Sequence, residues 1–511
     1  MRGTAVLLLL AAADANVYQY HDSVLRPNVI QYRRVGMYTA EDAPSAGAPG
    51  DGSSSITLKM DFRRTRFQQP GVIQLLVFHA SQLPLVGTGS GAARAFCCTP
   101  ELQMQSVPGC DRVGHIIVNA PTTRHGGGSD DARRLRAREE RDGRDAKGGG
   151  GGGGGAASGA KVWMREVSFG ENQGEATVDT KVAVHESGVH YLLLSSCDVQ
   201  TGEVLTTGET SWLNPYGYLP GELYPFLPFF GAMSGAYALL AIVWAVMCAR
   251  HWAQLLPLQL CIGGVLVLGV CETATWYHDY HNFNAGGTRG LAPVVIGVLV
   301  STVKKTLSRL LVLVVCLGYG VARPTLGATA WRVAALGALY FACSAVLDVA
   351  SNVAQLSEVS VPLRLLFILP VALLDALFYW WVFAALTRTL AQLSTRRQGA
   401  KLLLYRRFSH VLVVSIVLSA VWVSCQMGVI VSDALDARWA WLWIFDGFWH
   451  LLYFLILLAI CYLWSPSKNN LQYAYMDELA NLDEESLNDP DEDGGGSAEA
   501  VVTPYDLKRG A

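Results

Sequence analysis

The second half of this chain consists largely of long apolar segments, each close to the ~20 residues that a helix needs to cross ~30 Å of hydrocarbon. Seven such segments are bounded by polar clusters, at residues 226–249, 256–277, 291–320, 332–350, 363–386, 409–431 and 441–464. Apolar runs of this length are typical of transmembrane helices. The sequence therefore predicts an α-helical multi-pass membrane protein with a seven-helix bundle over residues 222–465.

The first 15 residues form a short apolar leader. Arg2 precedes an apolar run from Ala5 to Ala13, and small residues follow up to Ala15. A run of about nine residues is too short to span a membrane and fits a cleavable signal peptide. We therefore predict a signal peptide over 1–15 and a luminal region after it, with an uncleaved N-terminal anchor as the alternative.

The basic residues give an independent test of this orientation, because Lys and Arg concentrate in short cytoplasmic loops. The luminal loops hold mainly Arg289, Arg364 and Arg438. The loop between the fifth and sixth spans is far more basic, with Arg388, Arg396, Arg397, Lys401, Arg406 and Arg407. The distribution predicts a luminal N-terminus and a cytosolic C-terminus.

The segment after the last span, 466–511, is rich in acidic residues between Asp477 and Asp493. Such a stretch cannot bury enough apolar surface to fold, so we predict a disordered cytosolic tail. Tyr473 and Met476 fit the short Tyr-x-x-bulky pattern that adaptor proteins read, which makes them a candidate sorting signal.

The region 16–218 has the pattern of a β-sandwich. Ile56, Leu58, Met60 and Phe62 alternate with polar residues, as in a strand with one buried face. Short runs rich in β-branched residues predict further strands at Val72–Phe78, Val113–Val118, Val162–Phe169, Ala176–Val184 and Val189–Leu194. Between them, residues 125–160 carry an arginine-rich run and an unbroken glycine run, which predicts a disordered insertion.

Four of the eleven cysteines lie outside the predicted spans, all in this region. An even number in an oxidising compartment predicts two disulfides. Because a bond between neighbours would form a strained ring, Cys97 and Cys98 should each pair with Cys110 or Cys197, and the sequence leaves both connectivities open.

Ionisable side chains inside the spans should face the bundle interior, since exposing them to lipid costs roughly 2.5–3.5 kcal/mol each. Ser301, Lys304, Lys305 and Ser308 share one face of the third span, with Arg309 one turn beyond Lys305. The candidate counter-charges in other spans are Glu272, Asp348, Asp375 and Asp446. We predict that Asp375 pairs with Lys304 or Lys305; the alternative is that the basic side chains extend to an interface.

Two groups of histidines remain. Asp446 and His450 lie one turn apart on the seventh span, which predicts a hydrogen bond, with a pH-sensitive pair as the alternative. His278, Asp279 and His281 fall in the loop predicted after the second span, but they lack the further ligand that a metal site needs. No HExxH or GxSxG motif occurs, so we predict neither an enzyme nor a cofactor site.

Four stretches resemble a known family. The segment Val303–Gly327, with its Lys-Lys, Ser-Arg and Leu-Gly-Tyr-Gly elements, resembles the third span and following loop of the lung seven-transmembrane receptors, also called GOLD-domain seven-transmembrane proteins. Tyr379-Trp-Trp381, Leu404-Tyr-Arg-Arg-Phe408 and Trp464-Ser-Pro-Ser-Lys-Asn-Asn470 resemble the transmembrane protein eighty-seven branch of that family. The likeness covers about residues 216–475.

This resemblance implies a luminal GOLD-like β-sandwich on a seven-helix bundle, residence in Golgi and connected endosomal membranes, and a role in endosome-to-Golgi retrograde transport. It also implies membrane lipid as a partner, with a bundle cavity for a lipid or a lipidated cargo. A luminal protein and cytosolic coat or adaptor proteins are the other expected partners, and nucleic acid is not. A cation or mechanosensitive channel and a ligand-activated signalling receptor are the alternatives.

Overall fold

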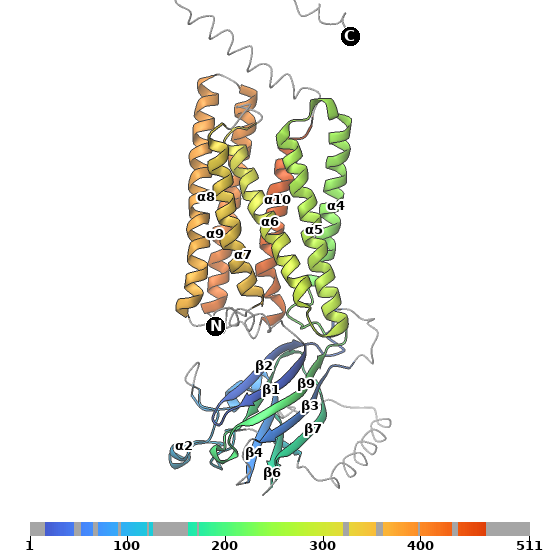
Figure 1. Cartoon of the computed structure of the whole chain (residues 1–511), viewed down its shortest axis with the longest axis vertical. Coiled ribbons are helices and arrows are strands. Elements are labelled where there is room, and N and C mark those ends of the chain that lie inside the picture. The colour runs from blue at the N-terminus through green and yellow to red at the C-terminus, as the bar shows by residue number, and fades with distance from the viewer. Residues whose placement is uncertain are drawn as a thin grey trace, which may run out of the picture.

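The structure, a computed structural model, describes residues 16–44, 53–64, 70–89, 94–119, 122–125, 162–170, 173–319, 327–353, 361–396, 399–431 and 438–466. The predicted signal peptide, most of the predicted insertion, nearly all of the tail, and the candidate sorting residues Tyr473 and Met476 lie outside these residues. The chain has two parts, a domain of strands and a bundle of long helices that stands on one end of it (Figure 1). We call the strand part the β domain.

The β domain consists of two sheets. Four antiparallel strands form the first, in the order β1 (Val17–Leu25), β9 (Val204–Leu213), β3 (Ser55–Arg64), β7 (Glu175–Ala183). The second has the order β2 (Ile30–Met37), β8 (Gly188–Ser195), β4 (Gly71–His79), β6 (Val162–Phe169), β5 (Thr122–His125), and only the β5–β6 pair is parallel. Side chains from both sheets share one apolar core, so the domain is a sandwich.

The alternation in β3 explains how one strand serves this core. Ile56, Leu58, Met60 and Phe62 are at most 1% exposed, whereas Lys59 and Asp61 between them face solvent. The predicted strand at 113–118 is wrong, because the described residues there form only isolated bridges, from Ile116 to Cys97 and from Val118 to Val86. A turn at Gly114, whose φ is +80°, interrupts the run.

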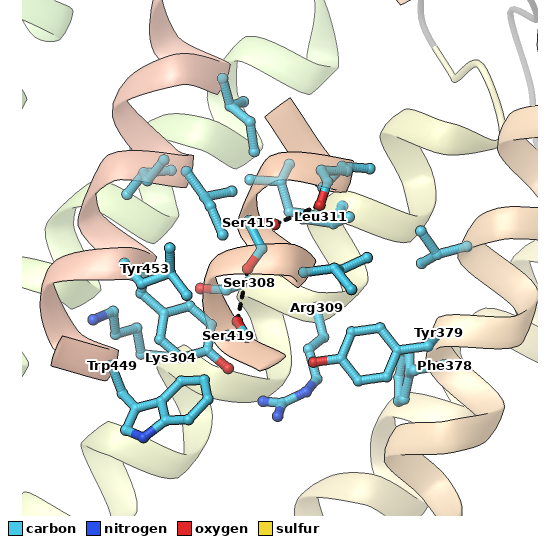
Figure 2. Close-up of a pocket in the computed structure, with 18 of the residues that line it drawn as sticks. Lys304, Ser308, Arg309, Leu311, Phe378, Tyr379, Ser415, Ser419, Trp449 and Tyr453 are labelled. Atoms are coloured by element: carbon cyan, nitrogen blue, oxygen red, sulfur yellow. Dashed lines mark hydrogen bonds between the residues drawn. The ribbon is translucent and has the colours of Figure 1, made fainter. Parts of the chain in front are cut away.

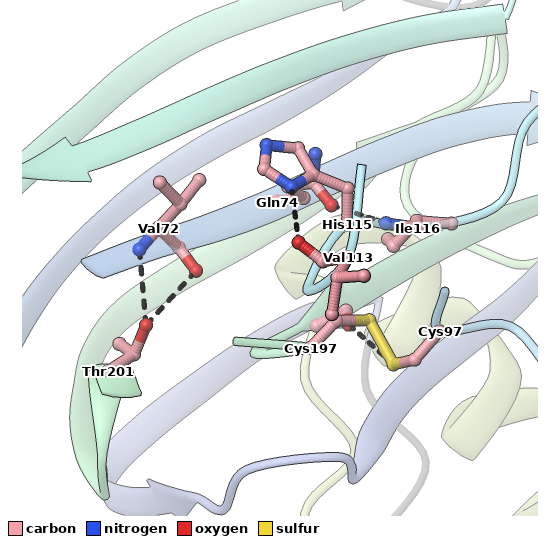
Figure 3. Close-up of a disulfide and its surroundings, with 9 residues drawn as sticks. Val72, Gln74, Cys97, Val113, His115, Ile116, Cys197 and Thr201 are labelled. Carbon is pink, nitrogen blue, oxygen red and sulfur yellow. Dashed lines mark hydrogen bonds between the residues drawn. A yellow bond between two sulfur atoms is a disulfide. The ribbon is translucent and has the colours of Figure 1, made fainter. Parts of the chain in front are cut away.

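Two disulfides lie in this domain and resolve the connectivity. Cys97 bonds to Cys197, and Cys98 bonds to Cys110. Figure 3 shows the first of them beside β4, where the Gln74 side chain accepts a hydrogen bond of 2.6 Å from the Ile116 backbone N–H. The disulfides and this contact hold the segment 97–116 against the second sheet although it contains little regular structure. Its regular structure among the described residues is the short helix α2 (Pro100–Met104).

The helical part contains seven long helices among the described residues: α4 (Phe226–Arg250), α5 (Pro257–Gly286), α6 (Leu291–Cys316), α7 (Thr329–Val353), α8 (Val361–Thr395), α9 (Gly399–Val431) and α10 (Trp443–Leu463). Six of the helices in the described ranges are long and apolar enough to cross a membrane. The six do not include α6, the helix that carries Lys304, Lys305 and Arg309. It lies among the others and packs against α5, α7 and α8 (Figure 1).

Three helices are longer than their apolar segments. The second predicted span ends at residue 277, but α5 continues to Gly286, and Gly287 caps it in a left-handed conformation with φ +72°. His278, Asp279 and His281 therefore lie on this helix, which corrects their prediction as loop residues. At the far side of the bundle, α8 continues to Thr395 and α9 begins at Gly399, about nine or ten residues beyond the predicted limits.

Backbone hydrogen bonds join the β domain to the bundle. The N–H groups of Asn16 and Val17 donate to the Gly287 carbonyl at 2.9 and 2.8 Å, and the Tyr218 N–H donates to the Asn284 carbonyl at 2.9 Å. The Asn284 side chain accepts from the Leu219 N–H at 3.1 Å and donates to the Tyr216 carbonyl at 2.8 Å. The end of α5 is thus fixed to the β domain.

Candidate functional site

The polar stripe of α6 forms three ion pairs, each with a different neighbouring helix. Lys304 Nζ lies 2.6 Å from Glu272 Oε2 on α5, and Lys305 Nζ lies 3.1 Å from Asp348 Oδ2 on α7. Arg309 Nε lies 2.9 Å from Asp375 Oδ1 on α8. Each cation thus has a carboxylate, so the charges inside this part of the bundle cancel in pairs.

The Glu272–Lys304 pair is the most deeply buried of the three. The two side chains are 1% and 5% exposed. The Ser301 hydroxyl, one turn before Lys304, donates to the second carboxylate oxygen of Glu272 at 2.6 Å. The Lys304 ammonium also lies 4.9 Å from the centre of the Tyr237 ring on α4, close enough for a cation–π contact. These contacts connect α4, α5 and α6 at one level of the bundle.

Asp348 binds more than one donor from α6. The Thr302 hydroxyl donates to its Oδ2 atom at 2.9 Å, and Lys305 Nζ donates to the same oxygen at 3.1 Å. Ser344, one turn earlier on α7, donates at 3.4 Å. Charged hydrogen bonds are stronger than neutral ones, so this group should fix the register of α6 against α7.

The predicted partner of Asp375 is wrong, since Asp375 pairs with Arg309 and with neither lysine. The two lysines face α5 and α7, where Glu272 and Asp348 already bind them. Arg309 also lies 4.7 Å from the centre of the Tyr340 ring, and its Nη1 has no hydrogen-bond partner among the described residues.

The remaining predicted polar residues differ in how they relate to this network. His450 lies close enough to Glu272 and Lys304 to interact with their charges. No hydrogen bond links Asp446 to His450 in the described part of the chain, so that prediction is wrong. The His450 ring instead packs against Phe229 and Phe230, with centroid distances of 6.4 and 5.1 Å. Asp446 is exposed at the first turn of α10. Asp279 forms an ion pair of 2.6 Å with Arg289, near the β domain.

A cavity of about 140 Å³ lies beside this stripe, between α6, α8, α9 and α10. Its walls are mainly leucine, isoleucine, valine and aromatic side chains. Lys304, Ser308, Arg309, Ser415 and Ser419 supply the polar groups, and Figure 2 shows Arg309 beside Tyr379 and Phe378. The cavity suits a molecule with an apolar body and a polar or anionic group near Arg309.

Sequence reasoning identified the charged residues of this site but missed the rings around them. Tyr237 and Tyr340 contact the cations, and Tyr379 and Tyr453 line the cavity. Aromatic residues are common in transmembrane helices, so a single tyrosine in an apolar run carries little signal. Among the described residues, no group of three metal-ligating side chains occurs.

Comparison with known proteins adds to this picture. Transmembrane protein 87A of Xenopus tropicalis is 36% identical over 275 residues, 54% of this chain and 50% of the relative. Transmembrane protein 87B of Mus musculus is 31% identical over 312 residues, 61% of this chain and 56% of the relative. Membrane protein PTM1 of Saccharomyces cerevisiae is 29% identical over 316 residues, 59% of this chain and 58% of the relative.

These matches span about half the length of the relatives. The family model for the GOST seven transmembrane domain matches residues 225–471, which include all seven long helices and every ion pair of α6. Six of the helices there are apolar enough to cross a membrane by composition, and α6 completes the seven. Residues 225–471 of this chain therefore match the GOST seven transmembrane domain, and the chain is similar to the transmembrane 87 proteins.

Proposed function

We propose that this protein is a trafficking receptor of the Golgi and connected endosomal membranes, acting in endosome-to-Golgi retrograde transport. In this proposal the β domain is luminal and recognises a protein or lipidated cargo, and the bundle cavity holds a membrane lipid or the lipid of the cargo. The cytosolic loops and the tail bind coat or adaptor proteins. The family resemblance of Val303–Gly327 supports the location.

The observation that carries a receptor role is the cavity with apolar walls beside charges that cancel in pairs. A water-filled path would need polar side chains along its whole length, whereas the cavity walls here are mainly apolar. A cavity of this kind favours an amphipathic ligand, since apolar walls bind its body and a few polar groups orient it. Because the end of α5 is hydrogen-bonded to the β domain, a movement in the bundle can be transmitted to that domain.

The cavity-filling substitution Ser419→Leu tests this proposal. Ser419 lines the cavity, so a leucine there should displace a ligand without adding charge. Cells lacking the endogenous protein would express the full chain, and an antibody bound to an epitope in the β domain would report its return from endosomes to the Golgi. We expect Ser419→Leu to slow that return severalfold.

The matched control is Val417→Leu, on the same helix, because Val417 is 56% exposed and does not line the cavity. It should leave return unchanged. Absence of the unsubstituted chain from the Golgi and endosomes would reject the location. Equal return of both variants would reject the cavity as part of the function.

A cation channel is the second candidate, favoured by the carboxylates of Glu272, Asp348 and Asp375, which three different helices direct at α6. Purified protein in liposomes, compared with an inert membrane protein, would show cation flux if this candidate is correct. Flux that changes in Asp375→Asn would favour the channel over the receptor.

A further inference from the structure

A second hollow lies between α8 and α9, two helices that also line the cavity described above. It has a volume of about 500 Å³ and lies toward the ends of these helices that point away from the β domain (Figure 1). Its polar lining residues are Ser394 on α8 and Arg406, Ser409 and His410 on α9. Leucine and alanine side chains line the rest. We call it the α8–α9 groove.

Helix lengths place this groove at the depth of lipid headgroups. The 33-residue helix α9 is ~50 Å long at ~1.5 Å per residue, well beyond the ~30 Å of hydrocarbon. Its part without charged residues runs from Val411 to the end at Val431, about 21 mainly apolar residues, which is enough to fill the hydrocarbon. Arg406, Ser409 and His410 precede that part by less than two turns. Ser394 likewise follows the apolar part of α8.

The electrostatics of this segment are one-sided. Residues 387–410 contain six Lys and Arg and no Asp or Glu. Arg406 and His410 are exposed, and no acidic side chain of the described residues forms an ion pair with Arg406. The α6 cations differ in that each has its own carboxylate. The positive charge of the groove is therefore free to bind an anion from outside the chain.

We propose that the α8–α9 groove binds the phosphorylated headgroup of an anionic membrane lipid. The guanidinium of Arg406 suits a phosphate because it donates parallel hydrogen bonds to two oxygens. The Ser394 and Ser409 hydroxyls and the His410 ring add donors, and the leucine side chains contact the start of the acyl chains. Basic residues at a membrane surface attract anionic lipid in general. Only a binding site with defined geometry would make lipid binding depend on one arginine and not on its neighbour.

Arg406 and Arg407 provide that distinction. Both are exposed, and both add one charge to the same turn of α9. Only Arg406 lines the groove. If the basic segment attracted the membrane only diffusely, substituting either arginine would weaken lipid binding equally. A headgroup site would instead lose affinity on substitution of Arg406 alone.

The experiment measures binding of a short-chain phosphatidylinositol phosphate to the purified full chain in phosphatidylcholine nanodiscs. We expect saturable binding that Arg406→Gln weakens roughly tenfold or more, as for loss of a charged hydrogen bond. Arg407→Gln should change the affinity less than twofold, and Arg406→Lys should keep part of it. Melting temperatures without the lipid would confirm that all three variants fold.

Three outcomes would overturn the proposal. The first is no saturable binding, and the second is equal weakening by Arg406→Gln and Arg407→Gln. The third is equally tight binding of the free inositol phosphate, which would make a soluble phosphate the ligand in place of a lipid. The measurement uses purified protein, so its result does not depend on the cellular location or on the trafficking role proposed above.

Discussion

At the scale of single residues, the bundle interior depends on pairing. Removing one partner of a buried ion pair leaves a charge without compensation and typically costs more than the pair contributes. The Arg309–Asp375 pair is the most informative case, because the other groups around the guanidinium are aromatic side chains such as Tyr340 and Tyr379. Loss of the Asp375 carboxylate should therefore strongly reduce the stability of the helix packing.

Asp375→Asn should destabilise the protein, because Arg309 is left without a counter-charge. A fully buried pair would cost about 3–5 kcal/mol, and partial exposure of this pair lowers that figure. Adding Arg309→Met should restore part of the loss. Adding Lys305→Met instead should be additive, because Lys305 binds Asp348. Melting temperatures in detergent for the singles and doubles form a double-mutant cycle. Coupling of Asp375 to Lys305 and not to Arg309 would contradict the observed pairing.

A buried histidine in the β domain makes stability depend on pH. His190 lies on β8, with its ring 5.2 Å from that of His79, and burial lowers its pKa to about 4. The unfolded chain takes up this proton near pH 6.5, but the folded chain does not. Stability should therefore fall as the pH drops from 6.5 to 4, by about 3 kcal/mol in total.

Melting temperatures of the full chain between pH 7.5 and 4.5 would measure this slope. His190→Gln removes the titrating ring, so part of the slope should disappear. His21→Gln on β1 is the comparison, because His21 is exposed in the same domain. An unchanged slope in His190→Gln would show that other groups set the acid sensitivity of the domain.

At the scale of elements, the sequence predicts the apolar parts of the helices better than their polar ends. The seven spans were recognisable because apolar runs must match the hydrocarbon. The last turns of α5 and the facing ends of α8 and α9 were missed, because helix outside the lipid has no such requirement. Strands β1 and β2 carry mixed, partly exposed side chains, so their alternation was too weak to detect. The pairing of Asp375 with Arg309 depends on which faces of α6 and α8 meet. The spacing of residues along one helix does not contain that information.

The two disulfides should differ in what they contribute to stability. Cys97 and Cys197 are 100 residues apart, whereas Cys98 and Cys110 are 12 apart. Closing the longer loop removes more freedom from the unfolded chain, about 4.7 kcal/mol against about 3 in the chain-entropy account. Replacing Cys97 and Cys197 by serine should therefore lower the melting temperature more than replacing Cys98 and Cys110. Equal shifts would indicate that the unfolded chain retains structure around these cysteines.

At the scale of the whole molecule, Asn284 makes several of the hydrogen bonds that join the two parts. Asn284 hydrogen-bonds the chain between β9 and α4 through both ends of its side chain and through its carbonyl. Changes in the bundle that move the end of α5 must therefore move the β domain or break these bonds. Each bond contributes about 1 kcal/mol, and leaving a buried partner unsatisfied costs more.

Asn284→Ala should loosen this junction, with about 2 kcal/mol lost and faster hydrogen exchange at Tyr216–Leu219. Asn282→Ala is the matched control, because the exposed Asn282 side chain contacts His278 on the same helix. Exchange at the junction should be unchanged in the control. The same exchange in both variants would mean that the backbone bonds at Gly287 hold the two parts together by themselves.

The pairing of α6 also bears on how the chain enters a membrane during synthesis. Glu272 is made before α6, but Asp348 and Asp375 follow it by tens of residues. When α6 leaves the ribosome, only Lys304 has its carboxylate, and the helix still carries Lys305 and Arg309. A helix with two uncompensated cations partitions poorly into lipid. We therefore expect α6 to stay out of the lipid until α7 and α8 have been synthesised. The three helices should then enter the bilayer together.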